Sequence, residues 1–328
     1  MCQRPPIVTP KSLGRELRAD ELHLLAPLVD AYRFKRFRDH RGIARRAAGA
    51  VMVAEIRETL DHVDGLVLTV RASRQEAVAV ARVLAWETEF FRVPMGRIEY
   101  VLAPTADAWQ AALREAVRAL RARGVRHVSL RLDVADLGSV SIAESEGFRL
   151  MDALVTYGAR LDKEAPREFR AVGRVRPLAP NDIDQVLDVA RHAFRAYPSR
   201  FHADPHLPDD RCDALYDEWA RKVSTGEMAD MVVVAEASDG TLLGFLAWRR
   251  CEPVSSIAGV PVWGGGLGAC RLGSGGAFGG LIRAAWGQTG VGIADCQTQI
   301  SNVPTIRVYE AVGLRYCRAE YTLHRWLS

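Results

Sequence analysis

Apolar residues recur along the chain with the two spacings that distinguish helices from strands. Residues 108–123 carry apolar side chains every three or four positions, which predicts an amphipathic helix that ends at Gly124. Residues 65–70 and 77–84 are apolar runs joined by a polar turn, which predicts a hairpin. Residues 128–132 then read as a strand. The first half of the chain therefore alternates strands and helices.

The second half repeats this order. A strand is predicted at 175–178, followed by a helix that ends near Phe194 and is capped by Asn181 or Asp182. Residues 231–248 form a predicted hairpin around an Asp-Gly turn. A Gly-rich segment, a helix, a strand, a short helix and a last strand complete the order.

The two halves align without a gap at an offset of 166 residues. Gly124 falls on Gly290, and Gly147 falls on Gly313. Because helix, strand and glycine positions coincide, we predict a tandem duplication. The predicted parts are an N-terminal domain with a helical extension at 1–160, a charged linker at 161–174, and a C-terminal domain at 175–328.

Composition narrows the class of protein. The chain has 328 residues, of which 48% are hydrophobic and 26% charged, as in ordinary globular domains. A net charge of +4 does not require a nucleic-acid partner. The six cysteines form no C-x-x-C pair and read as cytosolic thiols, so we expect a cytoplasmic protein. The uncharged run 253–270 holds two Pro and five Gly and is too poor in apolar residues to span a membrane.

The segment 263–280 is rich in glycine and enters a helix. Such a segment exposes backbone N–H groups at the positive end of the helix dipole, which suits a pyrophosphate. Glycine is needed there because a side chain would hold the phosphates away. Arg271 can add positive charge. The alternative interpretation is a flexible surface loop.

The segment 298–314 gives these features a context. A strand ends at Asn302, a short helix carries Tyr309, and Gly313 ends the helix. This pattern, together with the Gly-rich segment, resembles the acyl-CoA-binding end of the GNAT superfamily of N-acetyltransferases. The resemblance implies an α/β fold of two tandem GNAT-like domains, each with a mixed, mostly antiparallel central sheet flanked by helices. It also implies acetyl-CoA or another acyl-CoA as co-substrate.

The family motif, Q/R-x-x-G-x-G/A, is only partly matched. Counted from Arg271, the first expected glycine is replaced by Ser274. The residues that the resemblance assigns to the cofactor are Arg271, Gly273, Ser274, Gly275, Gly276 and Ala277.

Tyr309 and Asn302 are the predicted catalytic residues. When an amine attacks a thioester, the leaving group is a thiolate, and a phenol with a pKa of about 10 can protonate it. The resemblance places a tyrosine here for that role. The alternatives are that Tyr309 is a half-buried aromatic residue and that Asn302 only caps the helix.

The two copies differ at these positions. Asn302 is matched by Asp136, and Tyr309 by Ala143. Gly275 and Gly276 are matched by Trp109 and Gln110, which are better helix formers. We therefore predict that the chemistry lies in the second copy and that the first is a degenerate scaffold that shapes the acceptor cleft.

The segments 199–210 and 215–219 resemble GNAT enzymes that N-acylate nucleotide-linked amino sugars, of the TDP-fucosamine acetyltransferase type. Residues 322–326 and 86–98 are similar to the same enzymes. The predicted acceptor-binding residues are Arg200, His202, Trp248 and Asp295. A plain surface loop at 199–210 is the alternative.

Other polar groups were weighed for catalysis and metal binding. The sequence singles out no general base, and the candidates are Asp295, Glu236, Glu252 and His324. His202, Asp204 and His206 lie in a segment that prolines keep extended, so we predict no metal site. Basic residues at 33–46 alternate with aromatic residues, a pattern that can bind nucleic acid. The usual interpretation of such a segment is a solvated helix face, and we favour it here.

The sequence thus predicts an acyl-CoA-dependent N-acetyltransferase that acts on a primary amine of an amino sugar or a related small metabolite. We expect a monomer or homodimer with no nucleic-acid and no membrane partner. The alternatives are a non-catalytic acyl-CoA-binding or partner-binding scaffold, and an acyltransferase for a natural-product amine or a carrier protein.

Overall fold

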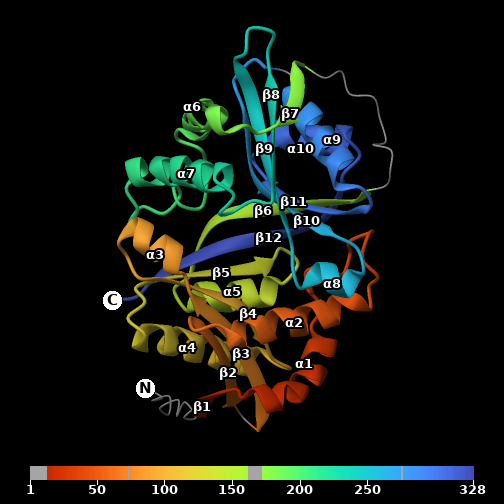
Figure 1. The fold of residues 1–328 in the computed structure, drawn as a ribbon. Helices are drawn as coiled ribbons and strands as arrows, with labels where there is room; N and C mark the ends of the chain where they lie inside the picture. The colour runs from red at the N-terminus through yellow and green to blue at the C-terminus, as the bar shows by residue number, and fades with distance from the viewer. Residues whose placement is uncertain (1–12, 73, 162–171, 275) are drawn as a thin grey trace. The chain divides into compact units, whose positions relative to one another are not determined.

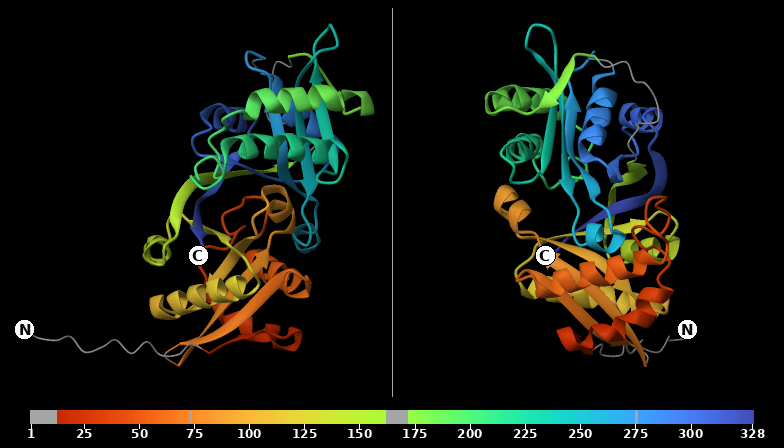
Figure 2. Two further views of the ribbon diagram at one scale, coloured as in Figure 1. Left: turned by 90° about the vertical axis from the view of Figure 1, so that its left-hand side faces the viewer. Right: turned by 45° about the vertical axis from the view of Figure 1, so that its right-hand side comes forward.

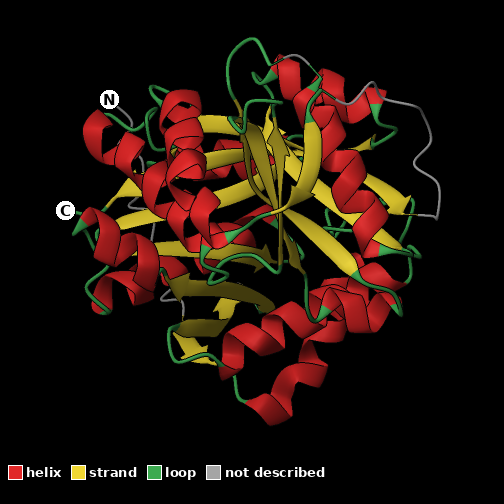
Figure 3. Ribbon diagram, turned by 45° about the horizontal axis from the view of Figure 1, so that its top comes forward, coloured by secondary structure: helices red, strands yellow, loops and turns green. Residues whose placement is uncertain are grey.

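The computed structural model describes residues 13–72, 74–161, 172–274 and 276–328. Contacts divide the chain into two compact units. Unit 1 comprises Met1–Lys35, Met52–Leu150 and Leu323–Ser328, and unit 2 comprises Arg36–Val51 and Met151–Thr322. Each unit has strands with helices packed against them (Figures 1 and 3). The α/β class predicted from the alternating pattern is confirmed.

The sheet of unit 1 is mostly antiparallel, with one parallel pair formed by its fourth and fifth strands. In the order of neighbours, its strands are β1 (Leu13–Glu16), β2 (Gly65–Ala72), β3 (Gln75–Val83), β4 (Met95–Leu102), β5 (His127–Asp133) and the end of β12 (Arg315–Trp326). The hairpin predicted at 65–84 is confirmed as β2 and β3, whose residues pair in unbroken register from Gly65 and Arg82 to Ala72 and Gln75.

Helices cover both faces of the strands of unit 1. They are η1 (Ala19–Leu25), α1 (Ala26–Ala31), α2 (Ala47–Asp61), α3 (Ala85–Phe91), α4 (Ala106–Ala122) and α5 (Leu137–Ser145), and the first residues of α2 belong to unit 2. Helix α4 matches the predicted amphipathic helix, and its apolar face packs on β2 and β3. On the other face, η1, α1 and α2 share a core with Val67, Val78 and Val80.

The sheet of unit 2 repeats this plan. In the order of neighbours its strands are β12, β6 (Arg149–Leu161), β11 (Gly292–Gln299), β10 (Val262–Cys270), β9 (Leu242–Arg250), β8 (Met231–Glu236) and β7 (Arg174–Pro177). Again one pair is parallel, β10 with β11. The predicted Gly-rich loop at 263–280 is corrected here, because residues 262–270 form a strand and only residues 271–276 connect it to the next helix.

Helices also flank the sheet of unit 2. They are η2 (Pro180–Asp182), α6 (Ile183–Phe194), α7 (Asp209–Ser224), α8 (Val254–Ala258), α9 (Ala277–Thr289) and α10 (Val303–Ala311). Helices α6 and α7 lie side by side on one face (Figure 2) and enclose a core with Phe245 and Ala247 of β9. Helix α9 packs on β8 and β9 from the other face.

Each unit contains a strand segment from the other half of the sequence. Strand β6 ends the first half, yet it pairs with β11 over eight positions, from Leu154 opposite Gln299 to Leu161 opposite Gly292. Conversely, the end of β12 belongs to unit 1, where the backbone N–H of Leu327 donates to Arg126 at 2.7 Å. The domain limits predicted at residues 160 and 175 stay a prediction, and most of the predicted linker lies outside the described residues.

Candidate active site in the second unit

The parallel strands β10 and β11 pair only at their beginnings. The register joins Val262 to Ile293 and ends with Gly264 opposite Asp295. Just beyond this point, the pairing of β10 with β9 shifts by one residue between Gly265 and Gly268, which marks a β-bulge. Strand β10 thus leaves its parallel neighbour and turns toward the start of α9.

The glycines of β10 are required by close packing around the bulge. A Cβ atom on Gly266 would lie 2.6 Å from the backbone oxygen of Ala247. One on Gly268 would lie 2.9 Å from side-chain atoms of Leu246 and Phe278. Since real Cβ atoms do not approach so closely, this stretch presents backbone in place of side chains. A strand with exposed backbone beside a splayed partner is suited to pair with an extended ligand.

The connection from β10 to α9 is built on two left-handed glycines. Gly273 has φ 82° and Gly276, at the N-cap of α9, has φ 85°. Ser274 lies between them, and its hydroxyl donates to the backbone oxygen of Arg271 at 2.6 Å. Ala277 is the first helical residue and is buried. The first-turn amides of a helix have no intrahelical acceptor, so this end of α9 favours an anion; Gly275 lies outside the described residues.

Arg271 is anchored to the body of unit 2. Its Nε donates to the backbone oxygen of Leu242 at 2.9 Å, and its guanidinium forms an ion pair with Asp188 of α6 at 2.5 Å. The pKa of Asp188 is lowered by the hydrogen bond from Arg271. Arg271 therefore fixes the start of the loop against α6 and β9, and its charge is already balanced.

Tyr309 lies on α10 and is buried, with 6% of its surface exposed. Its hydroxyl donates to the backbone oxygen of Gln297 on β11 at 3.4 Å. The rings of Tyr157 and Phe278 lie 5.6 Å and 6.5 Å from its ring. Phe278 is also the side chain that a Cβ on Gly268 would meet, so Tyr309 lies close to the bulged part of β10. Burial raises the pKa of Tyr309 well above its ordinary value, which keeps the phenol protonated.

Asn302 caps α10 and also joins a side-chain network. Its Oδ1 accepts from the backbone N–H of Thr305 at 3.3 Å, which confirms the capping role considered from the sequence. Its Nδ2 donates to the hydroxyls of Tyr197 at 3.1 Å and Thr298 at 3.0 Å. The Tyr197 hydroxyl in turn donates to Oε1 of Gln299. The network ties the end of β11 and the start of α10 to the segment that follows α6.

Arg200 and His202 continue that segment and make contacts within unit 2. The guanidinium of Arg200 lies 4.1 Å from the ring centre of Phe201. Nδ1 of His202 lies 3.0 Å from the hydroxyl of Ser199, and its Nε2 lies 3.1 Å from a carboxylate oxygen of Asp213. Both ring nitrogens of His202 are thus engaged by protein groups. These contacts order the segment.

Trp248 and Asp295 are both deeply buried. Trp248 is 1% exposed, and on β9 it faces away from Ala247 and the core beneath α6 and α7. Asp295 forms an ion pair with Arg36 at 2.9 Å. Burial alone would raise the pKa of Asp295, but the charges of Arg36, Arg318 and His40 outweigh it and lower that pKa. Asp295 is therefore held as a carboxylate.

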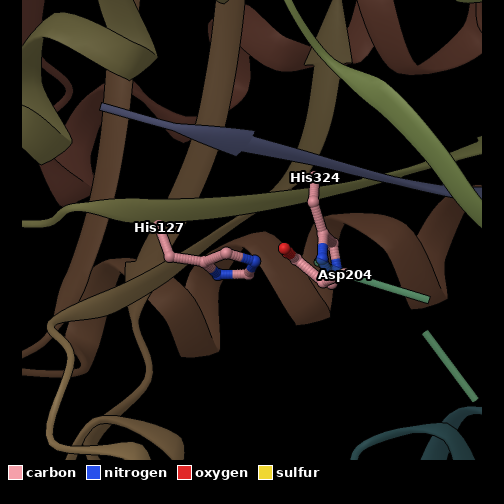
Figure 4. A group of neighbouring side chains, drawn as sticks. All are labelled: His127, Asp204 and His324. Carbon is pink, nitrogen blue, oxygen red and sulfur yellow. The ribbon is translucent and has the colours of Figure 1, made fainter. Parts of the chain in front are cut away.

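The other candidate bases are also paired or lie elsewhere. Glu236 forms an ion pair with Arg176 at 2.8 Å, and Glu252 one with Arg250 at 3.0 Å. His324 belongs to unit 1, where its ring lies edge-on to that of His127, with 4.3 Å between ring centres (Figure 4). None of these positions brings the side chain to Tyr309.

Sequence reasoning missed Tyr197, Thr298 and Gln299. Thr298 and Gln299 precede Asn302 closely in the sequence, and that proximity was an available signal. Tyr197 is 105 positions from Asn302 and carries no such signal. Among the described residues, no helix combines the length and apolar character needed to span a membrane.

Comparison with known proteins supports the fold. No protein-family model matches the chain. A GCN5-related N-acetyltransferase from Sphaerobacter thermophilus superposes with a TM-score of 0.63 at 16% identity over 97% of both chains. A tandem GNAT protein from the clavulanic acid biosynthesis pathway gives 0.55 at 15% identity, over 96% of this chain and 98% of that one. The chain therefore has the tandem GNAT fold, as the sequence resemblance predicted.

One curated protein is similar in sequence. The spore coat polysaccharide biosynthesis protein SpsD of Bacillus subtilis (strain 168) is 29% identical over 153 residues, which are 46% of this chain and 50% of that protein. The match thus spans about half the length of this relative. A glucosamine N-acetyltransferase region of a fungal multi-domain β-N-acetylglucosaminidase is similar in structure, with a TM-score of 0.57 at 13% identity over 97% of this chain and 38% of that one.

Proposed function

We propose that this protein is an acetyl-CoA-dependent N-acetyltransferase that acts on a primary amine of an amino sugar. The observation that carries the proposal is the backbone-lined strand β10, which splays from β11, leads to the N-terminus of α9 and lies close to the buried Tyr309. The names of the similar proteins, which refer to N-acetyltransferases and to polysaccharide biosynthesis, agree with this choice of reaction and acceptor.

The residues present fit an acyl-CoA. The pairing of β10 with β11 ends at Gly264, and the glycines that follow bring no side chains to this edge of β10. In the proposal, these backbone groups pair with the amide-rich pantetheine arm. Gly273 and Gly276 give the loop the left-handed turns that bring backbone to the start of α9. In the proposal, these amides and the end of α9 hold the pyrophosphate. Acetyl-CoA supplies the acyl group as a thioester.

Tyr309 acts as the general acid in this proposal. The neutral amine nitrogen forms a bond to the acyl carbon and the carbon–sulfur bond breaks. The nitrogen releases one proton to water, the sulfur takes one from Tyr309, and Tyr309 recovers a proton from water. Burial raises the pKa of Tyr309, so the phenol is protonated at neutral pH when the thiolate departs. Asn302 and Tyr197 position α10 and the acceptor segment, and Arg200 and His202 belong to that segment. Asp295, whose pKa is lowered chiefly by Arg36 and Arg318, has little tendency to take up a proton.

The test combines turnover with binding. The full chain is mixed with acetyl-CoA and a panel of amino sugars, free and linked to nucleoside diphosphates, and the release of free thiol is followed. The matched controls are the same sugars already N-acetylated, which have no amine to react. Thiol release with an amine only, together with a mass increase of the sugar by one acetyl group, is the expected result.

The alternative from another class is a non-catalytic acyl-CoA-binding protein. The lack of an evident general base favours it, because the candidate carboxylates Asp295, Glu236 and Glu252 are each held in an ion pair. Calorimetry with CoA and acetyl-CoA separates the two. Binding without turnover on any amine would support the alternative, and absence of binding to either ligand would overturn both.

A further inference from the structure

Unit 1 contains a cavity of about 300 Å³, at the lower limit of typical ligand pockets. Its walls come from the segment after α1, the end of β4, and the first turns of α4 and α5. Asp136, the N-cap of α5, lines it, and this residue falls on Asn302 in the second copy. The first copy thus retains a pocket where the second copy has its proposed cofactor site.

The pocket is not built for a pyrophosphate. Helix α4 begins at Ala106, directly after its N-cap Thr105, so the loop that precedes α9 in unit 2 has no counterpart of the same length. Trp109 lines the pocket and is 6% exposed. The carboxylates of Asp107, in the first turn of α4, and Asp136 already supply negative charge at the two helix N-termini. An added phosphate would be repelled there.

Three aromatic side chains supply the apolar surface of the pocket, namely Tyr32, Phe34 and Trp109. The rings of Tyr32 and Phe34 are perpendicular, 6.0 Å apart. The ammonium of Lys35 donates to the backbone oxygens of Tyr32 and of Asp30, the latter at 3.2 Å, which pins this segment. The ring faces are therefore held in place before any ligand arrives.

Polar groups of both signs complete the lining. Arg33 offers donors and Asp136 offers acceptors, and one carboxylate oxygen of Asp136 accepts from the backbone N–H of Ser139 at 3.3 Å. The hydroxyl of Thr105 donates to Gln75 at 2.6 Å and accepts from the backbone N–H of Ala108 at 3.4 Å, so it is held in place by both contacts. The lining is close to neutral, and it combines flat apolar faces with donors and acceptors. A ligand that matches it is uncharged and has an apolar C–H face and several hydroxyl groups.

We propose that this pocket of unit 1 binds an uncharged sugar unit, separately from the acyl-CoA site proposed for unit 2. A pyranose ring lays its C–H face on an aromatic ring, and its hydroxyls bond to Arg33 and Asp136. A pocket of this volume has room for one such ring. The inference does not rest on the proposed acetyl transfer, because the pocket lies wholly within unit 1.

The test measures binding of N-acetylglucosamine and of glucose to the full chain by saturation-transfer NMR and calorimetry. The variants are Asp136→Asn and Arg33→Gln. Asparagine keeps the helix cap, as Asn302 does in the second copy, so Asp136→Asn should not alter the melting temperature. The melting temperature of Arg33→Gln is measured alongside, so that a loss of sugar binding can be separated from a loss of folding. Each variant is expected to weaken sugar binding about tenfold or more, through loss of a charged hydrogen-bond partner. Asp239→Asn, at the exposed turn between β8 and β9 of unit 2, is the control and leaves sugar affinity unchanged.

Three outcomes would overturn the proposal. The first is that the wild-type chain binds neither sugar at millimolar concentration. The second is that both unit 1 variants bind sugar as the wild type does, which would place the sugar elsewhere. The third is that CoA displaces the sugar and that Arg33→Gln abolishes this displacement, which would make the pocket a nucleotide site. Failure of acetyl transfer in unit 2 would leave the expected binding results unchanged, so the two proposals are tested separately.

Discussion

The two units share a splayed pair of parallel strands but differ in what the first strand of each pair presents. Strand β4 contains a single glycine, Gly96, and carries the large side chains of Ile98 and Tyr100 around its bulge. Strand β10 contains four glycines, and its bulge exposes backbone. Both strands fold with the same pairing pattern. The glycines of β10 permit close packing at its bulge and leave that stretch without side chains.

The helices that follow these strands differ in the same sense. Helix α4 spans 17 residues from Ala106, while α9 spans 13 residues from Ala277. The additional first turn of α4 is built from good helix formers, where unit 2 keeps a loop with Gly273 and Gly276. Unit 2 thus has a loop where unit 1 has helical residues. Such a loop is expected of a ligand-binding site and not of a scaffold.

The largest expected effect comes from the residue that has no counterpart in unit 1. Tyr309→Phe removes the proton donor, and we expect turnover to fall by about 100-fold or more. Calorimetry should show acetyl-CoA binding nearly unchanged, since the ring remains. Tyr316→Phe is the matched control, because it makes the same change at a tyrosine that is 56% exposed. Unchanged turnover of Tyr309→Phe would remove this residue from the chemistry.

The second largest effect is expected from placing a side chain at the bulge of β10. Gly266→Ala puts a Cβ 2.6 Å from the backbone oxygen of Ala247, and relief of this clash is expected to cost about 1–3 kcal/mol of unfolding free energy. Gly265→Ala is the matched control, because its Cβ would meet Cys296 at an ordinary 3.4 Å. Denaturant unfolding measures both. Equal stability of the two variants would show that the bulge can relax.

Each unit has an arginine–carboxylate ion pair, and these pairs predict that the protein loses stability in acid. Arg15 pairs with Glu21 in unit 1, and Arg176 pairs with Asp182 in unit 2, each acid six residues after its arginine. The hydrogen bond from Arg176 lowers the pKa of Asp182. A lowered folded-state pKa stabilises the protein above the unfolded value of about 4, and that stabilisation is lost as the pH falls through the folded value.

Asp182→Asn should therefore destabilise the protein at pH 7 by about 1–2 kcal/mol and by much less below pH 3. Unit 1 sharpens the comparison, because Arg15 is 56% exposed against 22% for Arg176. Glu21→Gln is expected to have the smaller effect. Thermal melts between pH 2 and pH 7 give both values, and a loss that is constant across this range would exclude the carboxylate charge as its cause.

The smallest effect is expected for the exchange of helix caps. Asn302→Asp preserves the cap, since Asp136 accepts the equivalent bond from Ser139 in unit 1. It removes the Nδ2 donor and with it the two hydrogen bonds to Tyr197 and Thr298, each of which contributes about 1 kcal/mol to stability. We expect turnover to fall a few-fold and the melting temperature to fall by a few degrees. A matching loss in Tyr197→Phe would assign the effect to the network.

Local patterns in the sequence predicted the parts of the fold that are decided locally. The apolar spacing that ends at Gly124 predicted α4, and the residue type of Asn302 predicted the cap of α10. The Asp-Gly turn gave the β8–β9 hairpin. The Gly-rich run at 263–270 was misread as a loop, because glycine weakens the strand signal even where a strand forms for reasons of packing.

Long-range features left no such signal. The pairing of β6 with β11 joins residues of opposite halves, and the residue pattern of neither strand predicts which strand it pairs with. The ion pairs of Arg271 with Asp188 and of Arg36 with Asp295 depend on tertiary placement, so sequence reasoning could assign these residues to ligands but not to each other. The roles of the individual site residues stay predictions.

The shared strand β12 has a consequence for how the chain is made. Unit 1 includes Leu323–Ser328, yet all of its other residues precede Met151. A ribosome releases those residues long before it reaches Leu323–Ser328. During the synthesis of the second half, β5 therefore lacks β12, its neighbour in the sheet. Unit 2 has its borrowed strand, β6, available from the start. The sheet of unit 1 is therefore complete only after the second half has been synthesised.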